Sequence, residues 1–133
     1  MQREQMESML ETLFAPWIRE LDLQVDSISA EEVCLRLPFT PHLTHVAGVI
    51  CGQAHMAAAD TAMVLAVANA LGEFRPMTTV SMNTSFMRPV SAGDVRVTAR
   101  ILRRGKNLVF GEILLADSQG QLAVHATTTY ALL

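Results

Sequence analysis

The chain has 133 residues, of which 50% are hydrophobic and 17% are charged, and its formal net charge is −3 at pH 7. This length and composition exclude a disordered or low-complexity chain and fit a single domain spanning residues 1–133. The pI near 5.7 argues against a general nucleic-acid-binding protein. Cys34 and Cys51 are too few for a disulfide scaffold, and the N-terminus lacks the pattern of a signal peptide. We therefore expect a cytoplasmic protein.

The first third of the sequence predicts a helix followed by a hairpin. Residues 2–14 carry apolar side chains at helical spacing, with Met6, Met9 and Leu13 on one face, and Pro16 follows. From residue 21 the period changes, because apolar and polar side chains alternate over residues 21–26 and again over residues 33–37. A turn at residues 29–32 joins these two expected strands.

A long Ala-rich helix is expected next, after a loop at residues 38–47. It runs from about residue 49 to residue 71, and Gly72 is placed to end it. The stretch 46–71 is almost uncharged and long enough to cross a membrane, but Asp60 in its middle would be costly in lipid. We expect a buried helix of a soluble domain and no membrane partner.

After Pro76 the sequence alternates with period two in four segments, at residues 80–86, 95–101, 108–116 and 122–127. We expect these strands to form a meander, with residues 117–120 as its last hairpin turn. A helix with almost no charged face must be covered on most sides. The prediction is an α+β architecture in which one antiparallel sheet of about six strands wraps around the long central helix, as in the hotdog fold, with an additional N-terminal helix.

Asp60 is the first candidate functional residue, because it is the only charged residue between Phe39 and Glu73 and lies midway along the expected helix. A buried carboxylate is usually paired, solvated or functional. Its alternative role is that of a capping or ion-paired residue facing a crevice. The sequence alone leaves both roles open.

Gly48 and Gly52 lie where the loop enters this helix, and a helix N-terminus offers free N–H groups to an oxyanion. Gly52 and Asp60 are eight residues apart, which is about 12 Å along a helix axis. One helix therefore cannot bring both to a single carbonyl carbon. A shared site requires two antiparallel helices across a homodimer, each contributing one of the two residues.

Residues 48–62, GVICGQAHMAAADTA, resemble the helix-entry motif of the PaaI-like hotdog acyl-CoA thioesterases, in which the catalytic acid follows a G-x-x-H-G-G motif. The runs at 80–89, 103–107 and 117–120 are also similar to that family, and the resemblance covers about residues 20–132. It implies that Asp60 is the general base or the nucleophile and that the Gly52 N–H polarises the thioester carbonyl. It also implies that Thr79, or Thr78 if the register slips, helps to hold the attacking water.

The sequence departs from this family in four positions around the motif. Cys51 replaces the motif histidine, Gln53 replaces the second glycine, His45 stands where the family has Asn or Gln, and Val64 stands where many members have Ser or Thr. These changes are compatible with altered specificity, with low activity, or with a non-catalytic acyl-CoA-binding protein. His45 or His55 is a candidate to replace the missing imidazole.

A thiol nucleophile and a zinc site are two other kinds of chemistry to consider near the start of the expected helix. Cys51 near a helix N-terminus is a candidate thiol nucleophile, although nothing in the sequence pairs it with a histidine. A zinc site from His42, His45, Cys51 and His55 matches no standard ligand spacing. We expect neither a metal nor a cofactor.

The resemblance makes coenzyme A a partner for the basic stretch between Arg75 and Lys106, which has seven basic residues and one acid. Arg88, Arg104 and Lys106 are the candidates for its phosphates, with His45, Cys51 and Gln53 beside the substrate, whereas Arg96 and Arg100 alternate like an exposed strand face. The expected function is hydrolysis of acyl-CoA thioesters by a homodimer or a dimer of dimers. A non-catalytic acyl-CoA binder and a hotdog hydratase or dehydratase are the alternatives.

Overall fold

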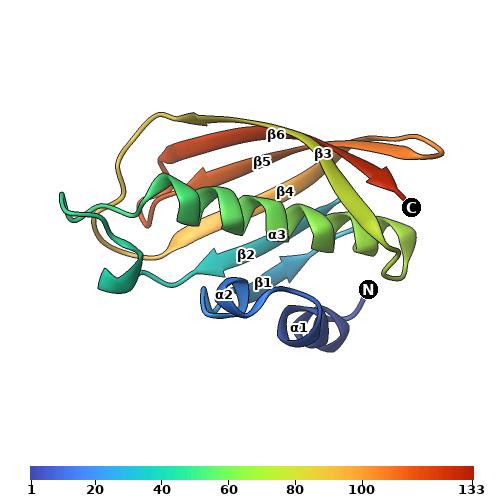
Figure 1. The fold of residues 1–133 in the computed structure, drawn as a ribbon, viewed down its shortest axis with the longest axis horizontal. Coiled ribbons are helices and arrows are strands. Elements are labelled where there is room, and N and C mark those ends of the chain that lie inside the picture. Colours follow the sequence, from blue (N-terminus) through green and yellow to red (C-terminus); the bar gives the residue numbers. More distant parts are fainter.

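The computed structural model describes residues 1–133 as one six-stranded sheet with three α-helices and a short 3-10 helix (Figure 1). In chain order the elements are α1 (Arg3–Thr12), α2 (Pro16–Arg19), β1 (Gln24–Ile28), β2 (Glu32–Leu37), η1 (Pro41–Leu43), α3 (Gly52–Leu71), β3 (Met77–Phe86), β4 (Val95–Arg104), β5 (Leu108–Ala116) and β6 (Leu122–Leu132).

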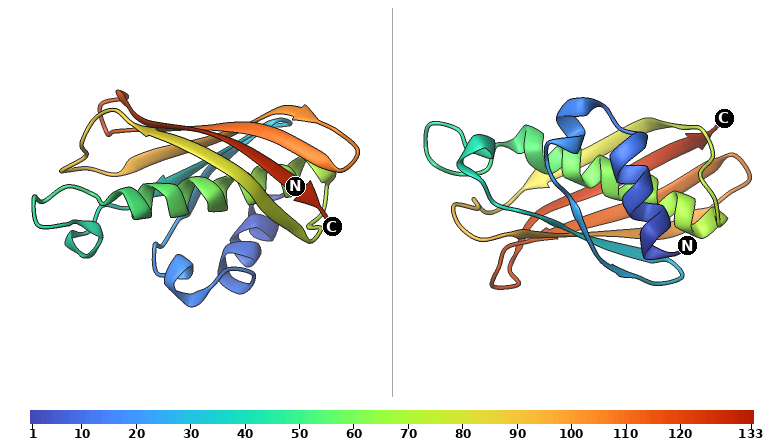
Figure 2. Two further views of the ribbon diagram at one scale, coloured as in Figure 1. Left: turned by 45° about the horizontal axis from the view of Figure 1, so that its top comes forward. Right: turned by 90° about the horizontal axis from the view of Figure 1, so that it is seen from below.

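The strand order is β1-β2-β4-β5-β6-β3, and every neighbouring pair is antiparallel. The expected four-strand meander is therefore wrong in one respect, because β3 pairs with β6 and not with β4. The cause is that β2 already occupies one side of β4, from Glu32 opposite Arg100 to Leu37 opposite Val95, and β5 occupies the other. This leaves β3 at the edge of the sheet, as the two views of Figure 2 also show.

Helix α3 lies along one face of the curved sheet, so that the strands wrap around it (Figure 1). Twelve of its residues are buried, among them an alanine-rich set that packs on β2, β4 and β5. It is the one helix long and apolar enough to cross a membrane, yet 67% of its most apolar window is buried within the protein. The predicted C-terminus is confirmed, because Gly72 has the left-handed φ of 84° that a helix C-cap requires.

The N-terminal helix is confirmed, with Met6 and Met9 buried, but the following segment differs from the prediction. The short helix α2 begins at Pro16, and backbone hydrogen bonds from Leu21 and Asp22 back to α2 continue its turn. The first strand therefore begins at Gln24 and not at residue 21. Leu21 is buried all the same, because its side chain belongs to the hydrophobic core while Asp22 beside it is exposed.

The last strand, β6, is longer than expected and continues its alternation to Leu132, with Thr128, Tyr130 and Leu132 buried on the helix side. The edge strand β3 contains a bulge between Thr79 and Ser81 where it pairs with β6. With the sheet wrapped around a long central helix and a helix at the N-terminus, the predicted hotdog fold is confirmed.

Candidate active site

Asp60 lies near the middle of α3 and is half-buried, facing the neighbouring strands β3 and β6. The Thr79 hydroxyl donates a hydrogen bond to its Oδ1 atom at 2.9 Å. The Tyr130 hydroxyl lies against the same Oδ1 atom and is 3.0 Å from the backbone oxygen of Asp60. One carboxylate oxygen is thus fixed by hydroxyls from two strands. The arrangement orients the carboxylate without neutralising it.

Tyr130 is a site residue that the sequence reasoning missed. Its side chain is only 1% exposed. Burial, with the charge and the hydrogen bond of Asp60, raises the pKa of Tyr130 far above its usual value. The phenol therefore stays protonated and acts as a donor. Extending the period-two pattern of residues 122–127 to residue 130 would have placed this side chain on the helix face.

Thr79 reaches Asp60 because of the bulge in β3. Strict alternation along β3 would put Thr79 and Met82 on opposite faces of the sheet. The bulge adds one residue, Val80, between the pairs Thr79–Tyr130 and Ser81–Thr129. As a result both Thr79 and Met82 face the helix. Thr78 is not hydrogen-bonded to Asp60.

Gly52 is the first residue of α3, and Cys51 precedes it as the N-cap without a side-chain hydrogen bond. The backbone N–H groups of Gly52 and Gln53 have no hydrogen-bond partner. A Cβ atom at Gly52 would lie 3.3 Å from the Phe86 ring, so glycine here permits close packing of that ring on the helix start. The helix N-terminus thus presents free donors beside an aromatic side chain.

A hollow of about 270 Å³ opens at this helix start. Its lining includes three predicted site residues, Gly52, His45 and Arg88, and it also includes His55 and Phe86. His45 is exposed, and its Nδ1 accepts the Ala47 N–H at 3.1 Å.

Of the remaining predicted substrate contacts in this region, Cys51 is half-buried and Gln53 is exposed. Gln53 shares an open stripe of α3 with Met56, Asp60 and Val64, which recur at helical spacing. Met63 does not belong to this stripe, because it is fully buried against Gly111 of β5.

Gly52 and Asp60 do not meet within one chain. Both belong to the straight run of α3, in which eight residues correspond to about 12 Å. Asp60 therefore lies beside Thr79 and Tyr130, while the free Gly52 N–H lies at the helix start beside Phe86.

The predicted basic contacts also divide between the two ends of α3. Arg88 lines the hollow at the Gly52 end, and its side chain has no partner. Arg104 donates a hydrogen bond to the backbone oxygen of Ala70 at 2.7 Å, at the C-terminal end of α3. Lys106 follows in the β4–β5 turn and is exposed.

Arg96 and Arg100 lie on an exposed strand face, as the alternation predicted. Arg100 forms ion pairs of 3.2 Å with Glu32 and with Glu112, and His125 contacts Glu112 at 3.0 Å. These groups occupy the side of the sheet that faces away from α3, and the charge of Arg100 is already matched by carboxylates.

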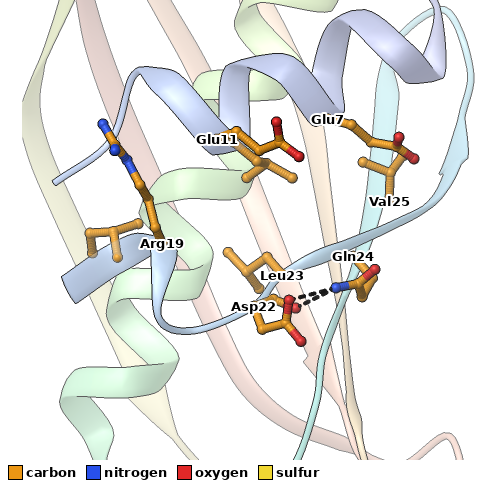
Figure 3. A pocket seen from close by; sticks show the side chains of 9 residues that line it. Glu7, Glu11, Arg19, Asp22, Leu23, Gln24 and Val25 are labelled. Carbon is orange, nitrogen blue, oxygen red and sulfur yellow. Dashed lines mark hydrogen bonds between the residues drawn. The ribbon is translucent and has the colours of Figure 1, made fainter. Parts of the chain in front are cut away.

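A larger hollow, of about 370 Å³, lies between α1, α2 and β1 (Figure 3). Glu7, Glu11 and Asp22 line it, and Gln24 donates to Asp22. It contains none of the predicted site residues.

No three His, Cys, Asp or Glu side chains anywhere in the chain form a cluster with the arrangement of a metal site.

Comparison with known proteins identifies the family. Residues 47–124 match the family model of the thioesterase superfamily. The chain is 30% identical over 114 residues to the "Putative esterase Ta0293" of Thermoplasma acidophilum, with 86% of each protein covered. Among solved structures, the conserved protein PA5202 of Pseudomonas aeruginosa has 27% identity and a TM-score of 0.84, with 92% of this chain and 98% of that chain covered.

The fold of the Escherichia coli PaaI protein, from the phenylacetic acid degradation operon, is also similar, with a TM-score of 0.86 over 98% of this chain and 91% of that chain at 15% identity. The PaaI-like resemblance read from the helix-entry motif is confirmed at the level of the family. These relationships support hydrolysis of thioesters or esters in general. The chain belongs to the thioesterase superfamily.

Proposed function

We propose that this protein hydrolyses acyl-CoA thioesters, with Asp60 as the group that activates water or attacks the thioester. The observation that carries the proposal is the Asp60 carboxylate, which is half-buried and oriented by hydroxyls of Thr79 and Tyr130. A positioned carboxylate in a largely apolar surrounding is suited to general-base or nucleophilic chemistry. Its second Oδ atom accepts no hydrogen bond within the chain and remains free for water or substrate.

In the general-base form of the reaction, Asp60 takes a proton from water while the water oxygen bonds to the thioester carbon. The carbonyl electrons move to oxygen, and the Gly52 N–H with the positive end of the α3 dipole stabilises the oxyanion. Collapse of this intermediate breaks the carbon–sulfur bond. Asp60 then gives the proton that it took from water to the departing thiolate, which yields the free acid and CoA. Neither a metal nor a cofactor takes part.

Because Gly52 and Asp60 are about 12 Å apart along α3, we propose that each site takes Gly52 from one protomer and Asp60 from the other. Strand β3 is a free sheet edge with unpaired backbone groups. Exposed apolar side chains lie on this strand at Val80 and Phe86 and beyond it at Met56 and Met87. A homodimer that pairs these surfaces antiparallel would cover them, and we propose a dimer of dimers as the alternative assembly.

For the coenzyme A portion we propose contacts with Arg88 beside the Gly52 hollow, and with Arg104 and Lys106. The last two lie at the far end of α3, so that in an antiparallel dimer they would approach the Gly52 end of the partner subunit. The acyl group would lie near Met56 and Met82 on the helix face of β3. The cytoplasm remains the proposed location, without nucleic-acid or membrane partners.

The test is thiol release from a panel of short, long, branched and aromatic acyl-CoA esters by the wild type and by Asp60→Asn. We expect turnover by the wild type and a loss of about 100-fold or more in kcat for the variant. Asp60→Asn is nearly isosteric, so folding is checked by thermal unfolding.

Two results would contradict the proposal. Wild-type rates in Asp60→Asn would remove Asp60 from the mechanism and favour Cys51, which Cys51→Ala then tests. Absence of turnover with every ester, with saturable binding of the same esters, would favour the non-catalytic binder.

A further inference from the structure

His55 is a buried polar side chain that the proposed reaction leaves without a role. It is only 3% exposed, and its Nδ1 atom is buried without any hydrogen-bond partner. No hydrogen bond is made by its other ring nitrogen either. Buried polar groups in folded proteins are nearly always satisfied, and an orphaned one costs free energy. The fold therefore retains at this position a group that destabilises it.

The position of His55 directs its ring towards the helix start. It is the fourth residue of α3, and side chains on a helix lean towards its N-terminus. His55 and Gly52 line the same hollow. The Phe86 ring packs on both residues: it is the nearest group to a Cβ at Gly52, and its centroid is 6.4 Å from that of His55. The orphaned imidazole and the free Gly52 N–H thus share one partly closed space.

Burial lowers the pKa of His55, so the ring is neutral at pH 7. A neutral imidazole has one N–H donor and one acceptor nitrogen. It can therefore donate to a carbonyl oxygen without placing a second full charge at the site.

We propose that the His55 imidazole is a second hydrogen-bond donor to the thioester carbonyl, beside the Gly52 N–H, and that it stabilises the oxyanion. This inference rests on the proposed function, because it uses the carbonyl position that Gly52 defines. It assigns a partner to the one orphaned ring at the helix start. It also adds a side-chain donor to a backbone donor, so that two hydrogen bonds converge where negative charge develops.

The kinetic test compares His55→Leu and His55→Gln with the wild type. Leu removes both ring nitrogens at similar volume, and Gln keeps an N–H donor. We expect His55→Leu to lose about 100-fold in kcat with little change in KM, and His55→Gln to recover part of that loss. His42→Leu is the matched control, because His42 is an exposed histidine in η1 whose side chain forms no hydrogen bond or ion pair.

Stability separates this role from a structural one. Replacing an unsatisfied buried polar group by an apolar one is neutral or stabilising, so the Tm of His55→Leu should equal or exceed that of the wild type. A Tm several degrees lower, with kcat lost in proportion to the folded fraction, would make His55 a packing residue and overturn the proposal. A wild-type kcat in His55→Leu would overturn it as well.

A binding measurement tests the contact without turnover. One CoA analogue replaces the thioester sulfur by CH₂ and keeps the carbonyl, and a second is an S-alkyl-CoA of the same chain length without the carbonyl. By titration calorimetry, His55→Leu should weaken the first about tenfold and leave the second unchanged. Equal effects on both would overturn the contact. If the wild type hydrolyses no ester, the proposed function fails, and this difference still decides whether His55 binds the carbonyl.

Discussion

Thr79 and Tyr130 face each other across the β3–β6 pair, and both hydroxyls reach the same oxygen of the Asp60 carboxylate. The pairing is a consequence of the β3 bulge, which turns Thr79 towards the helix. The orientation of the proposed catalytic group thus depends on the edge of the sheet. Any contact that stabilises β3, such as one with a second protomer, would also stabilise the orientation of the Asp60 carboxylate.

Tyr130→Phe should lower kcat about tenfold, because the charged carboxylate loses one of two donors and hydrogen bonds to charged groups contribute about 1.5–3 kcal/mol. The unfolding free energy should fall by about 1 kcal/mol. Thr79→Val removes the other donor and should act in the same direction. The double variant, measured in a cycle, should show coupling between the two sites. Strict additivity would mean that the hydroxyls do not act on one carboxylate.

Mixing two inactive variants tests whether the site is shared between protomers. Gly52→Pro removes the N–H at the first helical position, where proline is tolerated, and Cys51 before it already has extended backbone angles. Gly52→Ala keeps the N–H and is the control for added bulk against Phe86. Unfolded and refolded together with Asp60→Asn, Gly52→Pro should recover about a quarter of wild-type activity, since half of the dimers are mixed and each has one intact site. No recovery would place both residues in one chain.

Met56→Glu should produce monomers and abolish activity. Met56 is 38% exposed on the open stripe of α3, and a charge there opposes burial at a dimer interface. Leu102→Glu is the matched control, because Leu102 is 57% exposed near the end of β4. Light scattering after size exclusion measures the mass of each. A dimeric and active Met56→Glu would exclude this stripe from the interface.

The ionisation of Asp94 should make the unfolding free energy depend on pH in the acid range. The Phe39 N–H, at 2.9 Å, and the Arg36 guanidinium lower the pKa of Asp94 below 3.8. A lowered carboxyl pKa stabilises the fold above the unfolded-state value, and this contribution disappears as the pH falls through the folded-state pKa.

Asp94→Asn should therefore reduce the unfolding free energy at pH 7 by about 1 kcal/mol or less, since solvent screens this partly exposed pair. Near pH 2 the variant and the wild type should converge. Urea unfolding at both pH values measures the difference. Glu73→Gln, at an exposed position without an ion pair, is the control and should change neither value.

The central helix and its C-cap could be predicted because they depend on local sequence, as at Gly72. The position of β3 in the sheet could not be predicted, because the sequence of an edge strand does not indicate which neighbouring strand it pairs with. The early part of β1 was mispredicted for a related reason. Leu21 and Leu23 alternate with polar residues whether the segment pairs in a sheet or only turns these two side chains into the core.

Asp60 could be predicted as a site residue because it is the only charged residue in a long, largely apolar stretch of the sequence. Tyr130 was missed because its role arises from a long-range contact of 70 residues in sequence separation. Thr79 was named through a family resemblance. That it faces the helix depends on the bulge at Val80, which cannot be predicted from the alternating pattern. The unsatisfied ring of His55 becomes visible only once burial is known.

Helix α3 combines a closed side and an open side in twenty residues. Its alanines fit tightly against the sheet, so nearly any enlargement there would strain the core. The open stripe of Gln53, Met56 and Val64 around Asp60 is less tightly packed within the protomer, and the proposed dimer contact restricts it at Met56. Under the proposed function, substitutions along this stripe would change the substrate range at a smaller cost in stability than substitutions among the buried alanines.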